Sequence, residues 1–182
     1  MEVITYPLPG LLEFRPRIFG DPRGAFFESF SARTMENLGL PRHHWVQDNQ
    51  SSSKAGTLRG LHFQRPPHAQ AKLVRVAQGR ALDVVVDLRH RSPTFGQHAK
   101  VELTAALGNV FYVPEGFAHG FVALEDDTLF LYKCSDYYAP PAEGGLLWND
   151  PALGIAWGFE GEALVSPKDA ILPTLAELEN PF

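Results

Sequence analysis

Hydrophobic and polar residues alternate along this chain in short runs with a period of two. In the clearest run, Ala81–Leu88, every second residue from Leu82 to Leu88 is Leu or Val, while Asp83 and Asp87 fall on the opposite face. Such alternation is typical of a half-buried β-strand. Similar runs predict further strands at Gly24–Phe30, Leu58–Gln64, Lys72–Gln78, His98–Thr104, Asn109–Val113, Gly120–Ala123 and Thr128–Ser135.

Glycine and proline separate these runs. The 16 glycines and 15 prolines are spread along the sequence, which favours turns over long helices. Short strands at this spacing predict an all-β fold, either a sandwich or a barrel. Because inward side chains line the mouth of a barrel, such a fold offers a concave site. We therefore expect a single all-β domain over residues 1–182.

Two short helices are expected at the edge of this fold. The first runs from about Ala32 to Leu38, with Ser31 as its N-cap and Gly39 as its C-terminal stop. The second covers about 175–178 and begins after Thr174.

Composition narrows the classes of protein to consider. Hydrophobic residues make up 45% and charged residues 20%, which is ordinary for a soluble globular domain. No apolar run approaches the roughly 20 residues of a membrane span, and the N-terminus lacks the pattern of a signal peptide. Cys134 is the only cysteine, so no internal disulfide can form and a cytoplasmic location is expected. The net charge of −5 argues against nucleic acid as a partner but allows a phosphorylated small molecule.

Two segments have a spacing that points to one kind of barrel. They are GTLRGLHFQ (56–64) followed by KLVRVAQG (72–79), and GNVFYVPEGFAH (108–119). These segments resemble the two motifs of the cupin barrel, which read G-x5-H-x-H with E-x6-G, and G-x5-P-x-G-x2-H-x3-N. The resemblance implies a jelly-roll barrel with short peripheral helices.

The metal-binding residues of that motif are incomplete here. His62 and His119 are present, but Gln64 replaces the second His, Lys72 stands at the Glu position, and Ala123 replaces the terminal Asn. An ammonium group repels a divalent cation, and an amide is a poor ligand for a transition metal. We therefore expect no metal. On spacing alone, both histidines could instead be hydrogen-bonded interior side chains without a chemical role.

Within the cupins, the chain resembles the dTDP-4-dehydrorhamnose 3,5-epimerase family over Phe19 to Asp169. Departures are minor: Phe63 stands where Tyr is common, and Cys134 where Thr is common. The resemblance rests on the ordered blocks FGDPRGAFFESF (19–30), VQDNQSSS (46–53), LRGLHFQRPP (58–67), AQAKLVRVAQG (69–79), VDLRHRSPTFGQ (86–97), VPEGFAHGF (113–121), LYKCSDYYAP (131–140) and WNDPALGIAW (148–157).

The reaction of that family implies four catalytic roles. A 4-keto group acidifies the C–H bonds at sugar carbons 3 and 5, so that a base can form an enolate and an acid can return a proton from the opposite face. By resemblance, His62 is the base, and Asp169 orients its imidazole. Lys72 stabilises the enolate oxygen, and Tyr132 is the acid. No cofactor is implied.

Each of these residues also has a plainer interpretation. Lys72 shares a strand face with two valines, where an unpaired buried ammonium is costly, and this disfavours a structural role. Tyr132 shares a face with Phe130 and, taken alone, is a packed core aromatic. Asp169 lies in an SPKD segment and, taken alone, is a turn or cap residue.

The resemblance also implies a nucleotide-binding half of the site. Arg23 and Arg59 would hold the diphosphate, because guanidinium groups match phosphate oxygens, and Lys168 adds a third cation. Without the family, these three are solvated surface charges. His119 would lie near the sugar carbonyl.

The base and ribose have their own set of expected contacts. Tyr138 would stack on the thymine, and Glu143 would accept a hydrogen bond from the thymine or the ribose. The remaining contacts to the nucleotide fall to Gln47, Asn49, Phe26 and Glu28.

One geometric conflict follows from these assignments. Arg59 and His62 are an odd number of positions apart, so a regular strand cannot point both side chains inward. Either the strand bulges, or Arg59 lies at its end, or Arg59 serves a neighbouring subunit. The last option fits the family, which is dimeric and takes residues such as Phe26 and Glu28 from the partner.

The sequence therefore predicts an epimerase that acts at both carbons of a dTDP-linked 4-keto-6-deoxy-sugar, in dTDP-rhamnose biosynthesis. The alternative is a mono-epimerase of a related sugar, which uses much the same residues. A metal-dependent cupin oxygenase is disfavoured by Lys72, and a non-catalytic sugar-binding cupin is disfavoured by the complete catalytic set.

Overall fold

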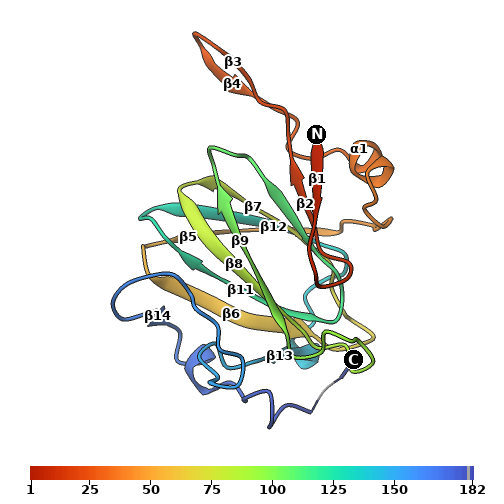
Figure 1. Cartoon of the computed structure of the whole chain (residues 1–182), viewed down its shortest axis with the longest axis vertical. Helices are drawn as coiled ribbons and strands as arrows, with labels where there is room; N and C mark the ends of the chain where they lie inside the picture. Colours follow the sequence, from red (N-terminus) through yellow and green to blue (C-terminus); the bar gives the residue numbers. More distant parts are fainter. Residues whose placement is uncertain (180) are drawn as a thin grey trace.

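Antiparallel strands make up most of the regular structure of the chain (Figure 1). The computed structural model describes residues 1–179 and 181–182. The helical elements are α1 (Ala32–Asn37) and two short 3-10 turns, Pro140–Ala142 and Asp169–Ile171. The strands are β1 (Glu2–Thr5), β2 (Leu12–Arg15), β3 (Phe19–Asp21), β4 (Gly24–Phe26), β5 (Gln47–Ser53), β6 (Thr57–Gln64), β7 (Lys72–Gln78), β8 (Arg80–Asp87), β9 (His98–Thr104), β10 (Val110–Val113), β11 (Phe117–Ala123), β12 (Thr128–Cys134), β13 (Glu143–Gly145) and β14 (Leu164–Val165).

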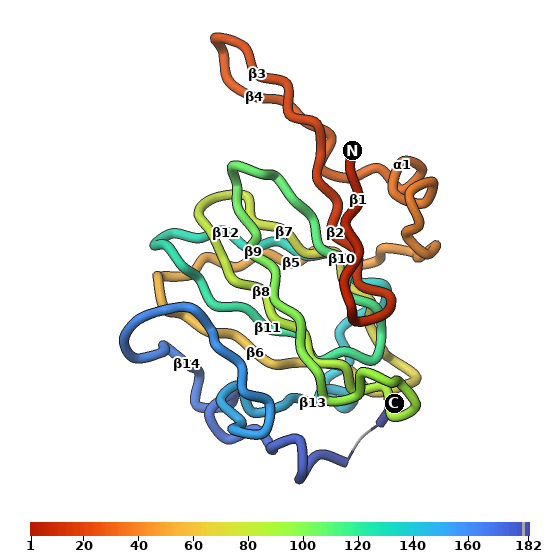
Figure 2. Tube along the Cα trace, viewed as in Figure 1, coloured from red at the N-terminus to blue at the C-terminus, as the bar shows by residue number. Residues whose placement is uncertain are grey.

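Two facing sheets form the body of the molecule. The first has the order β1-β2-β10-β7-β12-β5, and the second has the order β13-β6-β11-β8-β9, with β14 beside β6. Figure 2 shows them as two layers in the lower part of the trace. Their inner faces meet in a buried cluster that includes Val74, Phe111 and Phe130 from the first sheet and Val85 and Phe121 from the second. The predicted all-β fold is confirmed.

The chain after β13 covers the outer face of the second sheet, as the blue segment below β6 shows in Figure 1. Val84 and Val86 pack there against a buried cluster with Leu153 and Trp157. The sequence pattern described β8 as half-buried, but both of its faces are covered, and Asp83 has no exposed surface. The same covering segment returns through β14, parallel to β6, and so brings the 3-10 turn of Asp169–Ile171 beside the start of β6.

The first expected helix is confirmed. In α1 the Ser31 hydroxyl accepts a hydrogen bond from the Thr34 amide, and Gly39 has a φ of +104° just past the helix end. The second expected helix is wrong, because the segment after Thr174 forms a single hydrogen-bonded turn. The Glu177 carboxylate caps this turn by accepting from the amide and the hydroxyl of Thr174. A single turn gains too few backbone hydrogen bonds to continue as a helix.

Most of the expected strands lie within a few residues of their predicted limits, but one is shorter, and β1, β2, β3, β5, β13 and β14 were not predicted. The run Gly24–Phe30 is a strand only as far as Phe26. Strand β5, with the sequence QDNQSSS, was not predicted because it contains no hydrophobic residue. Its odd-numbered side chains turn inward towards the site, while its even-numbered ones are exposed to solvent. It forms a strand by pairing along its whole length with β12.

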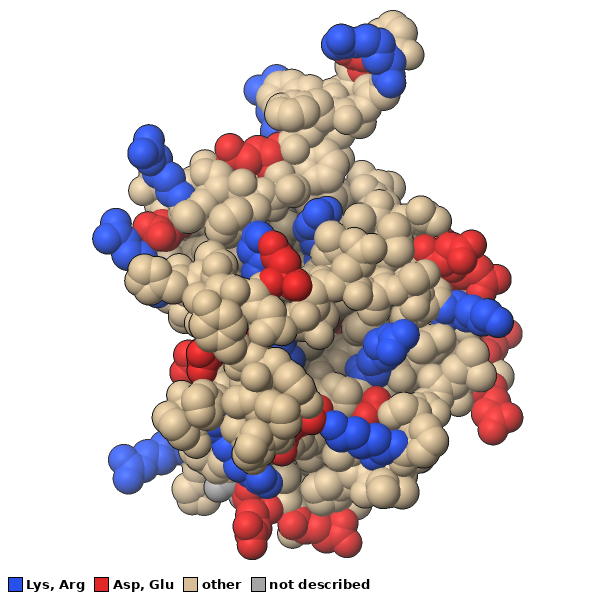
Figure 3. Space-filling view, turned by 180° about the vertical axis from the view of Figure 1, so that it is seen from behind, with Lys and Arg blue, Asp and Glu red and all other residues tan. Residues whose placement is uncertain are grey.

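A two-stranded arm extends away from the two sheets. Strands β3 and β4 pair only with each other, and Figures 1 and 3 show the arm standing clear of the body. Two large apolar side chains on it are unusually open to solvent, since Phe19 is 52% exposed and Phe26 is 72% exposed. Arg17 lies over the Phe19 ring, with its guanidinium carbon 4.8 Å from the ring centre, but much of both rings stays open to solvent.

Candidate active site

Two adjoining hollows open at one end of the barrel, and they share a wall formed by His62, Lys72 and Tyr132. The first hollow measures about 380 Å³ and the second about 240 Å³. The first is also lined by the predicted residues Arg59, His119, Lys168 and Asp169. The second is also lined by the predicted residues Gln47, Asn49, Tyr138 and Glu143.

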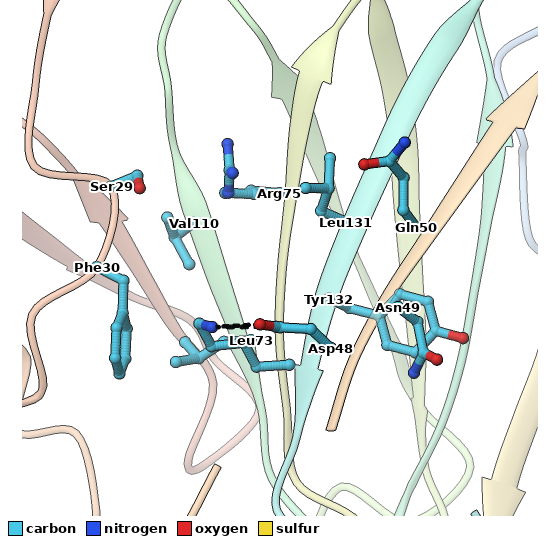
Figure 4. Close-up of a pocket in the computed structure, with 11 residues that line it drawn as sticks. Ser29, Phe30, Asp48, Asn49, Gln50, Leu73, Arg75, Val110, Leu131 and Tyr132 are labelled. Carbon is cyan, nitrogen blue, oxygen red and sulfur yellow. Dashed lines mark hydrogen bonds and ion pairs between the residues drawn. The ribbon is translucent and has the colours of Figure 1, made fainter. Parts of the chain in front are cut away.

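The two sheets supply opposite walls of this site. On the second sheet, His119 of β11 lies directly opposite His62 of β6. On the first sheet, Lys72 begins β7 and Tyr132 lies on the neighbouring strand β12. Figure 4 shows that Tyr132 and Asn49 lie on the other side of this sheet from Asp48, whose carboxylate pairs with Lys133 over an outer groove. The alternation of a strand therefore separates the catalytic face from the outer face.

A bulge in β6 resolves the conflict between Arg59 and His62. His119 pairs with His62 and Phe121 with Arg59, so three steps on β6 match two on β11. Gly60 lies in this bulge with a φ of +124°, and a Cβ there would stand 2.6 Å from the Cα of Gly120. The bulge turns both Arg59 and His62 into the first hollow.

His62 and Asp169 form a tight hydrogen-bonded pair, with 2.7 Å between His62 Nε2 and Asp169 Oδ1. The other carboxylate oxygen accepts from the backbone amide of Gly60 at 3.1 Å, and Asp169 is almost fully buried. Burial alone would raise the pKa of Asp169, but the hydrogen bond and charge of His62, together with the hydrogen bonds to Gly60 and Ser166, outweigh burial and lower that pKa. Because an ionised carboxylate only accepts, Nε2 carries a proton and Nδ1 is left as the basic nitrogen.

Lys72 and Tyr132 face this pair from the first sheet. The Lys72 ammonium lies 6.0 Å from the centre of the Tyr132 ring. Burial lowers the pKa of Lys72, and the charges of Asp83 and Glu143 act in the opposite direction. Burial also raises the pKa of Tyr132, which keeps its phenol protonated at neutral pH. The site therefore combines a basic imidazole, a cation and a proton donor around one space.

His119 has a carboxylate partner that the sequence did not reveal. Its Nε2 lies 2.8 Å from Oδ2 of Asp83, and both side chains are buried. Burial lowers the pKa of His119 and raises that of Asp83. The other oxygen of Asp83 is buried without a hydrogen-bond partner among the described residues. The signal in the sequence was an Asp alternating with apolar residues in a strand, which resembles the polar face of any half-buried strand.

The second hollow carries a linked set of polar side chains. The Tyr138 hydroxyl donates to Oε2 of Glu143 at 2.8 Å, and Lys168 pairs with the same oxygen at 2.7 Å. The Tyr138 amide donates to Gln47, which in turn donates to Asn49. The Tyr138 ring itself is 53% exposed, so its face is free to stack on a flat ligand.

Three predicted residues are not brought to these hollows. Arg23 and Phe26 lie on the arm, where Arg23 pairs with Asp21 at its exposed tip, and Glu28 follows just after it. None of the three lines either hollow of its own chain.

At the positions that bind a metal in other cupins, the side chains of this chain make other contacts. His62 and His119 each direct Nε2 to a carboxylate, and the amide of Gln64 bonds to backbone groups. Across the described residues, no group of three or more His, Cys, Asp and Glu side chains is placed to hold a metal ion. The residues present do not fit a cupin metal centre.

The fold and the site together define an acid–base enzyme on a cupin-type jelly roll. A hydrogen-bonded imidazole, a buried ammonium and a phenol around one space are the groups needed to move protons at a carbon next to a carbonyl. No helix in the described part of the chain has the length and apolar character to cross a bilayer.

Comparison with known proteins identifies the family. A model of the dTDP-4-dehydrorhamnose 3,5-epimerase family matches residues 5–177. The dTDP-4-dehydrorhamnose 3,5-epimerase of Salmonella typhimurium is 51% identical over 96% of both chains. The crystal structure of a Legionella pneumophila dTDP-6-deoxy-D-glucose-3,5-epimerase in complex with dTDP-4-keto-L-rhamnose has a TM-score of 0.94 at 43% identity, covering 98% of this chain and 94% of that one. The chain belongs to the dTDP-4-dehydrorhamnose 3,5-epimerase family, and it is an isomerase.

Proposed function

We propose that this chain inverts carbons 3 and 5 of dTDP-4-dehydro-6-deoxy-D-glucose to give dTDP-4-dehydro-L-rhamnose. The observation that carries this proposal is the shared wall of His62, Lys72 and Tyr132 between the two hollows. It provides a base, a cation and an acid around one space, beside a second space that suits a nucleotide. The ligand of the Legionella relative, dTDP-4-keto-L-rhamnose, is the product that this assignment predicts.

Each inversion follows the same two proton transfers. His62 Nδ1 takes the proton from the carbon next to the keto group, and the C–H electron pair moves to form an enolate on O4. Lys72 stabilises the negative oxygen, with His119 beside it, in a site where burial strengthens the interaction. Tyr132 then gives its proton to the opposite face of the same carbon. Before the next inversion, Tyr132 is reprotonated from solvent and His62 releases the proton it took to solvent. Asp169 keeps the proton on Nε2 of His62 throughout.

The second hollow and its border hold the nucleotide in this proposal. Arg59 and Lys168 bind the diphosphate, and Tyr138 stacks on the thymine. Gln47, Asn49 and Glu143 provide donors and acceptors for the base and the ribose. This arrangement is supported by the polar network that already links these side chains.

Product analysis tests the proposal directly. The purified protein is incubated with dTDP-4-dehydro-6-deoxy-D-glucose together with a 4-keto reductase, which traps each product, and the stereochemistry is read by NMR. We expect the rhamnose configuration, with solvent deuterium at both carbons 3 and 5. Products inverted at one carbon only would contradict the double inversion but not the epimerase class.

A mono-epimerase is the alternative function, because one of the similar solved structures is named as such. The 3'-monoepimerase ChmJ of Streptomyces bikiniensis in complex with dTDP-quinovose has a TM-score of 0.88 at 37% identity, covering 94% of this chain and 87% of that one. The same fold therefore serves single inversion in another protein. The product analysis above separates the two functions.

We further propose that catalysis needs no metal. The support is the side-chain chemistry at the former metal positions, where Gln64 bonds to the backbone and Lys72 provides a positive charge. Activity should survive exhaustive chelation with EDTA. A stoichiometric transition metal whose removal abolishes activity, and whose return restores it, would contradict this proposal.

We also infer a homodimer in which the arm completes the partner's site. The arm carries Arg23 and Phe26 away from the hollows of its own chain, and its aromatic rings are open to solvent. A second copy would bury these rings and place Arg23 near a diphosphate. Light scattering should give twice the chain mass of 20.2 kDa.

We also propose a cytoplasmic location, because the buried thiol of Cys134 is free and free thiols persist in a reducing compartment.

A further inference from the structure

Gln64 stands where a metal-binding cupin has its second histidine, and its side chain is fully engaged with the backbone. It is only 5% exposed and lies at the end of β6, next to the second hollow. Its Nε2 donates to the carbonyl of His68 at 2.7 Å and to the carbonyl of Tyr137 at 3.2 Å, and its Oε1 accepts from the amide of Ala139 at 2.8 Å. Both N–H donors and the oxygen of the amide group are directed at two loops.

The two loop contacts at 137 and 139 flank Tyr138. This segment, between β12 and the turn at Pro140, has no regular secondary structure. Its peptide groups are therefore not held by a strand or helix ladder and need other partners. Gln64 binds the peptide groups on both sides of Tyr138, while Gln47 accepts from the Tyr138 amide at 2.9 Å. Two glutamine side chains thus take the place of a neighbouring strand.

The Tyr138 side chain depends on this backbone for its position. Apart from the bond of its hydroxyl to Glu143, the ring is half open to solvent, so few packing contacts fix its plane. A stacking platform needs a fixed plane, because a ring that must be ordered on binding loses part of the gain in stacking.

We propose that Gln64 is a positioning residue that holds the Tyr138 ring in the plane required for binding the nucleotide base. The inference rests on the proposed function, in which Tyr138 stacks on the thymine. A position that ligates a metal in other cupins is used here to fix the base-binding loop. Gln64 lines the second hollow and not the first, so its effect is expected on nucleotide affinity and not on the proton transfers.

The test measures binding and turnover in Gln64→Met, which keeps the side-chain length and removes the amide. We expect Kd for dTDP and KM for the dTDP-sugar to rise about tenfold, within the range lost when a base loses its aromatic stacking partner. The value of kcat at saturation should stay within about twofold, because His62, Lys72 and Tyr132 are unchanged. Binding of inorganic pyrophosphate, which has no base, should also be unchanged.

A double-mutant cycle with Tyr138→Ala identifies the route of the effect. In the Tyr138→Ala background, Gln64→Met should change Kd for dTDP by less than twofold, since the ring that Gln64 positions is gone. Equal losses in both backgrounds would overturn the proposal. If Tyr138→Ala itself leaves dTDP affinity unchanged, the stacking role fails, and with it the proposed nucleotide site. If Tyr138→Ala weakens binding but Gln64→Met does not, only the present inference fails.

Two further variants guard against a general loss of structure. Gln70→Met removes a similar amide, also on the wall of the second hollow, that donates to the Asp136 carbonyl at 2.8 Å, two residues before Tyr138. It should leave dTDP affinity within about twofold, and a loss equal to that of Gln64→Met would overturn the assignment. Gln64→Glu keeps the volume and the acceptor for Ala139 but, when ionised, loses both N–H donors. Its dTDP affinity, relative to wild type at each pH, should recover in part as the pH falls and the carboxyl gains one O–H donor; no recovery would also count against the proposal.

Discussion

At the scale of single residues, the His62–Asp169 pair sets which nitrogen acts as the base. Asp169 accepts from His62 Nε2 at 2.7 Å and from the Gly60 amide at 3.1 Å, so it fixes both the tautomer and the bulge beside it. His62→Ala should lower exchange of the C3 and C5 protons with D2O at least about 100-fold, the range of a lost general base. Asp169→Asn should lose less, because the imidazole remains. NMR of the sugar protons measures both, and near-normal exchange in His62→Ala would move the base elsewhere.

Tyr132→Phe should separate proton removal from inversion. A proton returned by His62 itself restores the starting configuration, so net inversion needs a donor on the opposite face. With His62 and Lys72 intact, exchange with solvent should continue at one carbon at least, while inversion falls at least about 100-fold. The measurement is deuterium incorporation beside product stereochemistry. Equal losses of exchange and inversion would show that Tyr132 is not simply the acid, and no change in either would make it a packing residue.

The sequence was informative about residues that carry chemistry and much less so about the residues that support them. Motif spacing and family resemblance pointed to His62, Lys72 and Asp169, which the structure brings to one hollow. Asp83 and Gln64 were not assigned a role, because their partners are distant in sequence. Asp83 bonds to a residue 36 positions away, and Gln64 to one 75 positions away. Such contacts depend on sheet register, which local patterns do not determine.

At the scale of elements, the bulge in β6 is the feature on which the site depends most. An alanine Cβ at Gly60 would lie 2.6 Å from Gly120 Cα and 2.8 Å from the His119 carbonyl, at a φ of +124°. Gly60→Ala should therefore lower the free energy of unfolding by about 3 kcal/mol or more. The matched control is Gly154→Ala, at a φ of +57° with no atom within 4 Å of the new Cβ, where about 1 kcal/mol is expected. Urea unfolding compares them, and similar losses would contradict this account.

Strand β5 and the arm show where sequence patterns stop being informative about elements. The QDNQSSS sequence of β5 has no hydrophobic period, because one of its faces lines a polar site and the other faces water. It becomes a strand only through pairing with β12. Strand β4 of the arm was predicted as part of a longer strand, Gly24–Phe30. In the structure Phe26 faces solvent whereas Phe27 and Phe30 are partly buried, a difference that a pattern of hydrophobic positions cannot anticipate.

The loop from β8 to β9 is held by one buried carboxylate. Asp87 accepts from Arg89, Ser92 and Thr94 at 2.6 to 2.9 Å. Burial alone would raise its pKa, but these hydrogen bonds lower the pKa of Asp87 to about 2.

A carboxyl with a depressed pKa stabilises the folded state above its unfolded pKa, and this contribution is lost as the pH falls through the folded pKa. Asp87→Asn should therefore lower the free energy of unfolding by about 2 kcal/mol at pH 7. The difference from wild type should narrow as the pH falls from about 4 towards 2. Asp127→Asn, at an exposed turn, is the control and should change stability by less than about 0.5 kcal/mol. A pH-independent difference at Asp87 would contradict the linkage.

At the scale of the whole molecule, each chain holds a nearly complete site and an arm that does not reach it. The hollows contain His62, Lys72, Tyr132 and Asp169, whereas Arg23 stands at the tip of the arm. If the arm serves a second copy, every functional site in the dimer combines the barrel of one chain with the arm of the other. The two parts can then be inactivated separately and recombined.

Mixing two defective variants tests this arrangement. In an Arg23→Ala and His62→Ala heterodimer, the intact barrel of the first chain meets the intact arm of the second, so one site of two is complete. Refolding the variants together at equal amounts makes half of the dimers heterodimers, so activity should return to about a quarter of wild type per subunit. The control mixes His62→Ala with Tyr132→Phe, whose defects both lie in the barrel, and it should restore nothing. Turnover is measured at substrate concentrations well below KM, where loss of a diphosphate contact is most visible. Activity of the first mixture that merely equals the sum of its two components would show that the arm does not complete the partner's site.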